Sequence, residues 1–258
     1  MVLGIRDALA PNQECPYCCC ALDESSSPEE EHFIPHVFYV EDVPRNEKPR
    51  VRACKKCNRE KSKVDQRCWL ELAVCLPMEN PIYSDMVAKA LRSMNPESAR
   101  TDDQDRTHRQ AQLEAMLSKT RTVHDESGFS PIPLLMPPDT GPDGERAIIE
   151  MDRISWDKWL SFVIRGIWTF GTLEALPLDT QIGFQFENKE FREETLEGLK
   201  TKGLPPLPPF IDMGVTFKAN VVFDTNHHQM VADIIIWDIL LVIAFVARPN
   251  TGLTDGGQ

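Results

Sequence analysis

The 258-residue sequence predicts an α+β protein with a small, cysteine-rich N-terminal module and a C-terminal domain built on an antiparallel sheet. Three observations predict this class. Two Cys-x-x-Cys pairs lie before residue 60, apolar residues recur at helical spacing in two segments, and β-branched and aromatic residues dominate three runs after residue 179. Because the chain exceeds the usual size of one domain, more than one is expected.

The N-terminal module is expected to span residues 1–80 and to close with a helix over about 58–76, which Pro77 stops. Along that helix the apolar residues recur at steps of four, four and three, so they share one face: Val64, Cys68, Leu72 and Cys75. This spacing favours Cys68 and Cys75 as core residues over metal ligands.

Residues 81–146 are expected to form a helical and Pro/Gly-rich linker. A polar segment over 95–121 has helical character, and the stretch SGFSPIPLLMPPDTGPDGE after it contains too many prolines and glycines for a regular helix or an inner strand.

The remaining residues, 147–258, are expected to form an α+β domain whose role the sequence does not indicate. AIIEMDRISWDKWLSFVIRGIWTF predicts a helix, with an apolar or close-packing stripe at Ile154, Trp159, Phe162, Val163, Gly166 and Ile167. TQIGFQFEN, GVTFKANVVFD and HHQMVADIIIWDILLVIAFVA predict strands, with His227 and His228 in a turn.

The charge is distributed unevenly. The formal net charge is −12, which argues against a protein that binds nucleic acid over its whole surface. Residues 45–67 nevertheless carry ten basic and three acidic side chains. Any contact with nucleic acid is therefore expected in this segment.

The N-terminus MVLGIRDALAPNQ has no apolar signal core, so a reducing, cytoplasmic location is expected, and there the eight cysteines favour metal over disulfides. The most apolar run, 234–247, is interrupted by Asp238 and is too short to span a bilayer, so no membrane association is expected. The sequence contains no phosphate-binding glycine loop and no Gly-x-Ser-x-Gly elbow.

The two cysteine pairs, Cys15-Pro-Tyr-Cys18 and Cys54-Lys-Lys-Cys57, have the spacing of tetrahedral Zn²⁺ ligands. The alternative, two unrelated pairs of buried thiols, fits poorly with the polar stretches around them. The run CPYCCC leaves open whether Cys19 or Cys20 replaces Cys18, and we keep Cys18 because its spacing matches the second pair. Four thiolates saturate zinc, so the ion is expected to be structural.

Between the pairs lies an acid-His-x-x-Pro motif, Glu31 to Pro35, and the second pair continues as Cys-x-x-Cys-Asn-x-x-Lys-Ser, Cys54 to Ser62. Together with the upstream CPYC these residues, about a quarter of the chain, resemble the HNH endonucleases, which have a zinc-stapled ββα-metal (treble-clef) finger. The resemblance implies an HNH-like nuclease module over 1–80.

The same resemblance implies roles for single residues. His32 would be the general base that takes a proton from water, and Glu31 and Asn58 would bind a catalytic Mg²⁺ or Mn²⁺. The basic residues that would hold phosphates are Lys55, Lys56, Arg59, Lys61 and Lys63. The implied activity is hydrolysis of phosphodiester bonds, in DNA in preference to RNA.

One position departs from the family. A middle Asn usually fixes the His-bearing loop, but at about that position this chain reads Glu47-Lys48-Pro49-Arg50, and Asn46 falls a few residues early. The alternative function is therefore a non-catalytic zinc finger that binds nucleic acid or protein. In either case the C-terminal domain could select a substrate, a protein partner or a second copy of the chain.

Overall fold

The computed structural model describes residues 9–40, 43–78, 80–99, 103–123, 146–187 and 189–247. The chain is mixed α+β, and every paired strand in the described part is antiparallel. It forms two compact units, Met1–Ser62 with Asp157–Gln258 and Lys63–Trp156. This division differs from the predicted one at 80 and 146, because the N-terminal module packs with the C-terminal sheet. The proline-rich stretch over 127–145 lies outside the described residues.

The first unit begins with a short antiparallel pair followed by a helix: β1 (Glu29–Glu31), β2 (Val51–Ala53) and α1 (Lys55–Ala73). The helix begins and ends about three residues earlier than predicted. At its start, the backbone N–H of Asn58 donates to the carbonyl of Cys54 at 3.0 Å. At its end, Cys75 donates to the carbonyl of Leu72 rather than continuing the α-helical pattern.

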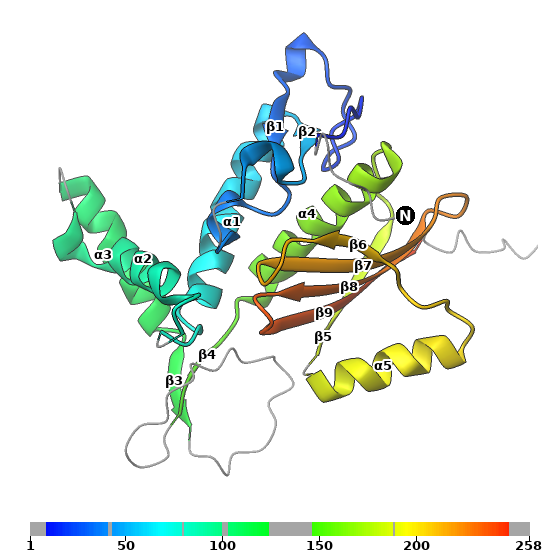
Figure 1. Ribbon diagram of the computed structural model, residues 1–258. Coiled ribbons are helices and arrows are strands. Elements are labelled where there is room, and N and C mark those ends of the chain that lie inside the picture. The colour runs from blue at the N-terminus through cyan, green and yellow to red at the C-terminus, as the bar shows by residue number, and fades with distance from the viewer. Residues whose placement is uncertain are drawn as a thin grey trace, which may run out of the picture. The chain divides into compact units, whose positions relative to one another are not determined.

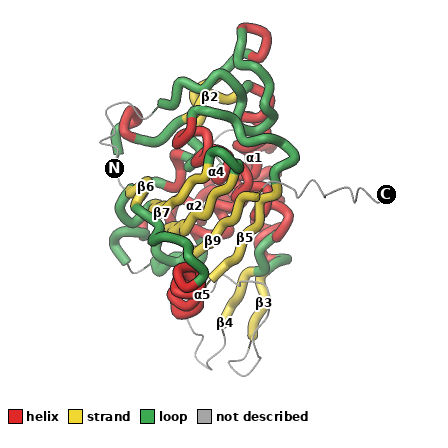
Figure 2. Tube along the Cα trace, turned by 90° about the vertical axis from the view of Figure 1, so that its right-hand side faces the viewer, coloured by secondary structure: helices red, strands yellow, loops and turns green. Residues whose placement is uncertain are grey.

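The C-terminal sheet has five strands in the order β5-β9-β8-β7-β6 (Figures 1 and 2). Their bounds are β5 (Gln181–Glu187), β6 (Pro209–Asp212), β7 (Phe217–Asp224), β8 (Gln229–Ile236) and β9 (Leu240–Ala247). The three predicted strand segments are confirmed, and the last forms two strands because Trp237 and Asp238 turn with positive φ. His227 and His228 lie in the β7–β8 turn, as predicted.

Two helices, α4 (Arg153–Thr172) and α5 (Lys189–Thr201), contact opposite faces of this sheet. Trp168 of α4 contacts Phe223 of β7 with ring centroids 5.9 Å apart, while Arg192 of α5 pairs with Asp233 of β8. The predicted α4 stripe is correct except at Ile154, whose side chain is 82% exposed. Ile154 lies five residues before Trp159, which rotates it about 140° away from the buried face.

Aromatic packing joins the N-terminal module to α4 and the sheet. Phe38 stacks on Trp159 and on Trp237, with ring centroids 5.0 and 5.2 Å apart. The indole N–H of Trp237 also donates to the carbonyl of Phe38 at 2.7 Å. These contacts fix the segment that follows His32.

The second unit contains α2 (Ser84–Met94), α3 (Asp103–Leu117) and the antiparallel pair β3 (Thr120–Val123) and β4 (Arg146–Ile149). Its buried polar centre is Glu71, which accepts hydrogen bonds from the Trp156 indole at 2.7 Å and from Lys119. Cys68 and Cys75 are buried, as predicted. Among the described residues, no helix has the length and apolar character that crossing a bilayer requires.

Candidate metal centre and the residues around it

The four predicted zinc ligands meet in one cluster. The Sγ atoms of Cys15, Cys18, Cys54 and Cys57 all lie within 4.8 Å of one another, and those of Cys18 and Cys54 are 3.7 Å apart. Tetrahedral zinc with Zn–S bonds of 2.3 Å separates its sulfurs by roughly 3.8 Å. The cluster therefore fits a metal ion such as zinc.

Of the three consecutive cysteines, Cys18 belongs to the set of four sulfurs, and Cys20 contacts that set through hydrogen bonds with Cys18 and Cys54. Cys19 has a left-handed backbone (φ 54°), and its Sγ donates to the carbonyl of Leu176 at 3.3 Å. Cys18 is the one whose sulfur joins the cluster, as the spacing predicted, and Cys20 lies outside the set of four.

The thiols of the cluster differ in acidity. Burial raises the pKa of Cys15 to about 11, and burial also raises that of Cys57. Burial opposes ionisation of Cys18 as well, but hydrogen bonds from Cys20, Cys57 and Cys15 outweigh it and lower its pKa to about 7. A thiolate at Cys18 is thus stabilised by its neighbours, whereas Cys15 and Cys57 would need a cation to ionise near neutral pH.

The strand before the predicted base faces helix α1. Glu29 and Glu31 lie on the same side of β1 because side chains alternate along a strand. The amide Nδ2 of Asn58 donates to Glu29 at 2.7 Å, and the ammonium of Lys61 lies 2.9 Å from Glu31. Glu29 was missed by sequence reasoning, although its position two residues before Glu31 places it on the same face.

Lys61 is not available to bind phosphates at the surface. Its side chain is fully buried, pairs with Glu31, and donates to the backbone carbonyl of His32 at 3.1 Å. The structure thus corrects the predicted role of this lysine: it ties the helix to the strand and to the His-bearing segment. The other predicted basic residues, Lys55, Lys56, Arg59 and Lys63, are exposed on α1.

His32 is half-buried at the end of β1, where the next residues enter the core. Phe33 and Ile34 are buried, and Phe33 packs against Gly166 so closely that a Cβ on this glycine would lie 2.3 Å from Phe33 Cβ. The His32 ring lies 6.4 Å, centroid to centroid, from the ring of His36. The His32 backbone is thus held by Lys61 on one side and by Phe33 on the other.

A buried lysine stands near the His-bearing turn, at about the place where the family's middle Asn was expected. Lys48 is 1% exposed, lies over the ring of Tyr39 at 4.6 Å, and its Nζ is 3.0 Å from Nε2 of His36. Since an ammonium only donates, His36 Nε2 is the acceptor. Asn46, the nearest asparagine, is exposed.

Comparisons of the chain with protein-family models, with curated proteins and with solved structures find no match.

Proposed function

We propose that this chain is a metal-dependent endonuclease of the HNH type that hydrolyses phosphodiester bonds in nucleic acid, DNA before RNA. One observation carries the proposal. The four-cysteine cluster, which could hold zinc, anchors a ββα unit on which Lys61 connects the carboxylate of Glu31 with the backbone of His32, while Asn58 faces the same strand. The resembling residues are therefore close in space as well as in sequence.

His32 is the general base of the proposed reaction. An imidazole accepts a proton near neutral pH, and phosphodiester hydrolysis needs a base within hydrogen-bond reach of the attacking water. Holding the backbone at His32 and Phe33 fixes where the ring can point. Lys48 takes the place of the missing middle Asn in fixing the His-bearing loop, because it contacts both His36 and Tyr39 in the turn that follows the base.

The carboxylates of Glu29 and Glu31 and the amide oxygen of Asn58 are hard oxygen donors, which suit Mg²⁺ or Mn²⁺. When bound, such a cation supplies charge stabilisation at the phosphate and at the leaving oxygen. Lys55, Lys56 and Arg59 extend from the exposed face of the first turns of α1 and would contact backbone phosphates.

The second candidate is a zinc finger that binds nucleic acid without cutting it. It is favoured by the Lys61–Glu31 pair, since an ammonium already neutralises the carboxylate that would bind the catalytic cation. Binding without cleavage in any divalent metal supports this candidate.

The discriminating experiment incubates purified protein with supercoiled plasmid, single-stranded DNA and single-stranded RNA, each with Mg²⁺, Mn²⁺ or EDTA. Metal-dependent nicking that EDTA abolishes supports the nuclease. Binding should weaken on every sequence when Lys55 and Lys56 become Gln, and its salt dependence should flatten. Replacing Lys200 and Lys202, which are exposed and outside this segment, with Gln provides the matched control.

A further inference from the structure

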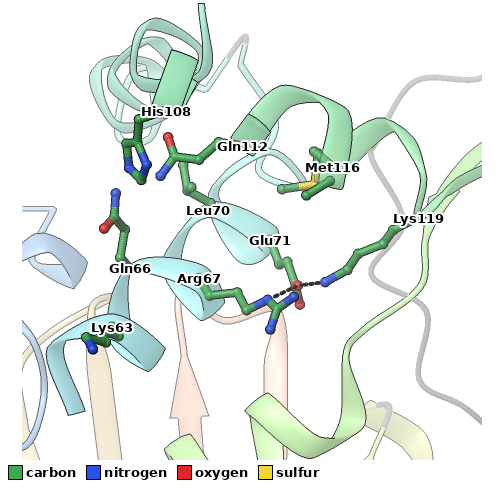
Figure 3. Close-up of a pocket in the computed structure, with 10 residues that line it drawn as sticks. Lys63, Gln66, Arg67, Leu70, Glu71, His108, Gln112, Met116 and Lys119 are labelled. Carbon is green, nitrogen blue, oxygen red and sulfur yellow. Dashed lines mark hydrogen bonds and ion pairs between the residues drawn. The ribbon is translucent and has the colours of Figure 1, made fainter. Parts of the chain in front are cut away.

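The second unit contains a pocket that the proposed nuclease site does not use (Figure 3). It is a cavity of about 300 Å³ between the later turns of α1 and helix α3, at the lower end of the range for small-ligand sites. Its ten lining residues come from Lys63 to Glu71 of α1 and from His108 to Lys119, on α3 and just after it. All of them belong to the unit Lys63–Trp156.

At one end of the pocket the charged side chains are paired with other groups of the protein. Glu71 is buried and accepts hydrogen bonds from Lys119 and from Trp156, and Arg67 lies 4.0 Å from the same carboxylate. Figure 3 shows Arg67 and Lys119 converging on Glu71 from opposite sides. Arg67 also pairs with Asp152 at 2.8 Å. The charges at this end of the pocket therefore balance.

The other end presents polar groups that the protein leaves open. Within the part of the chain that the structure describes, the side chains of Lys63, Gln66, His108 and Gln112 make no hydrogen bond or ion pair. Figure 3 shows Gln66 and Gln112 directed toward His108, with Lys63 at the near side of the helix. Two amides, an imidazole and a lysine at this end can therefore bind a polar ligand.

Leu70 and Met116 lie between the two ends (Figure 3), and Ala115 adds a further apolar lining group. A methionine thioether makes favourable contacts with aromatic rings, and the stems of Lys63 and Arg67 add apolar surface. The pocket therefore combines a floor for a flat ring, amides that can bond to the edge of that ring, and a lysine with no carboxylate partner among the described residues.

We propose that this pocket binds a nucleotide, with the base on Met116 and Leu70, its edge at Gln66 and Gln112, and the phosphate on Lys63. A primary amide offers a donor and an acceptor side by side, which matches the edge of a base, adenine above all. A phosphate accepts charge-assisted hydrogen bonds from lysine. The nucleotide could be free in solution or part of a nucleic-acid strand, and both present the same chemistry.

The test measures binding to the full chain in EDTA, so that no cleavage is required. Adenosine monophosphate, adenosine, inorganic phosphate and a short single-stranded oligonucleotide are titrated by calorimetry. We expect adenosine monophosphate to bind more tightly than adenosine or phosphate alone. If the oligonucleotide binds and the free nucleotide competes for its site, the natural source is a strand; if only the free nucleotide binds, it is a free metabolite.

Two variants locate the site. Ala115→Phe fills the pocket from an exposed position on α3 and should abolish binding, whereas Ala111→Phe, exposed one turn earlier and outside the lining, should not. Lys63→Gln should lower the affinity for adenosine monophosphate roughly tenfold and the affinity for adenosine little. Arg106→Gln, which removes an exposed charge on α3, should change neither affinity.

Circular dichroism verifies that each variant is folded. If Ala115→Phe does not fold, the affinity of Lys63→Gln alone tests the proposal. Failure of all four ligands to bind the parent protein would overturn the proposal. So would binding that survives both Ala115→Phe and Lys63→Gln. Neither result bears on the nuclease proposal, because the readout needs neither His32 nor a divalent cation.

Discussion

At the scale of single residues, burial rather than charge decides what the basic side chains of the N-terminal module do. Lys48, Arg50 and Lys61 all count toward the positive segment, yet each is buried and engaged with the module itself: with His36, with Glu30 at 2.5 Å and with Glu31. A buried charge is expensive unless it is paired, so these three residues stabilise the loops of the module. Only the exposed basic side chains of the module are available to bind a partner.

Lys61→Met should lower the free energy of unfolding by about 3 kcal/mol, because it leaves the buried carboxylate of Glu31 without this ammonium. Urea unfolding measures the change. Lys55→Met, an exposed position at the start of the same helix, should stay within about 0.5 kcal/mol of the parent. Equal effects of the two substitutions would show that Lys61 is not buried as described.

Gly166→Ala should destabilise the protein by about 1 to 3 kcal/mol, since the new Cβ would lie 2.3 Å from Phe33 Cβ and force one of them to move. Gly198→Ala is the matched control within a helix, because nothing lies within 4 Å of that Cβ. It should be neutral or stabilising by up to about 1 kcal/mol. Thermal unfolding of both variants checks the pair, and a neutral Gly166→Ala would contradict the close packing on Phe33.

At the scale of elements, each helix of the first unit is fixed to the sheet or strand beneath it by a specific contact. Arg192 of α5 donates two hydrogen bonds to Asp233 of β8, at 2.7 and 2.5 Å, and Asn220 of β7 donates to the same carboxylate at 2.9 Å. The hydrogen bonds that Arg192 donates to Asp233 raise the pKa of Arg192. A surface helix with few apolar side chains is thereby tied to the sheet.

Arg192→Met should loosen α5 and cost about 2 to 3 kcal/mol, because Asp233 would stay buried after losing its cation. Hydrogen exchange, compared with the parent, should accelerate at the α5 amides more than at the β7–β8 amides. Lys200→Met, which removes an exposed pair with Glu197, is expected to leave α5 protection unchanged. If α5 exchange is the same in both variants, Arg192 does not hold the helix.

At the scale of the whole molecule, local patterns were predictable and long-range packing was not. The cysteine spacing predicted the cluster, the apolar period predicted α4, and the β-branched and aromatic runs predicted four of the five strands of the sheet, with β6 missed. Helices α2 and α5 were missed; α5 carries few apolar residues, so its pattern was weak. The N-terminal module is joined to the sheet by contacts such as that of Phe38 with Trp237. These residues lie 199 positions apart, and such a contact produces no periodic pattern in the sequence.

The candidate site was predictable to the same extent. The family resemblance named Glu31, His32 and Asn58 as candidates, but only tertiary packing shows that Lys61 is buried and that Lys48 lies near the turn. Neither burial could be foreseen, because lysine in a basic segment is ordinarily exposed.

The metal centre should be required for the N-terminal module to fold. Cys54→Ser should abolish metal binding and the order of the module, since a structural zinc contributes about 10 kcal/mol or more in small fingers. Cys19→Ser should retain the metal, because that sulfur lies outside the cluster. Elemental analysis and protease resistance measure the outcome, and a metal-free protein with a protease-resistant module would contradict it.

The central claim is that His32 is the base of a phosphodiesterase, and the initial rate of plasmid nicking by His32→Ala tests it most directly. We predict a loss of about 10²- to 10⁴-fold, with zinc content, folding and DNA affinity kept, because His32 lies outside the cysteine cluster. His227→Ala, an exposed histidine in the β7–β8 turn, should cut at the parent rate. If His32→Ala cuts as fast as the parent across a range of Mg²⁺ and Mn²⁺ concentrations, His32 is not the base and the claim is wrong.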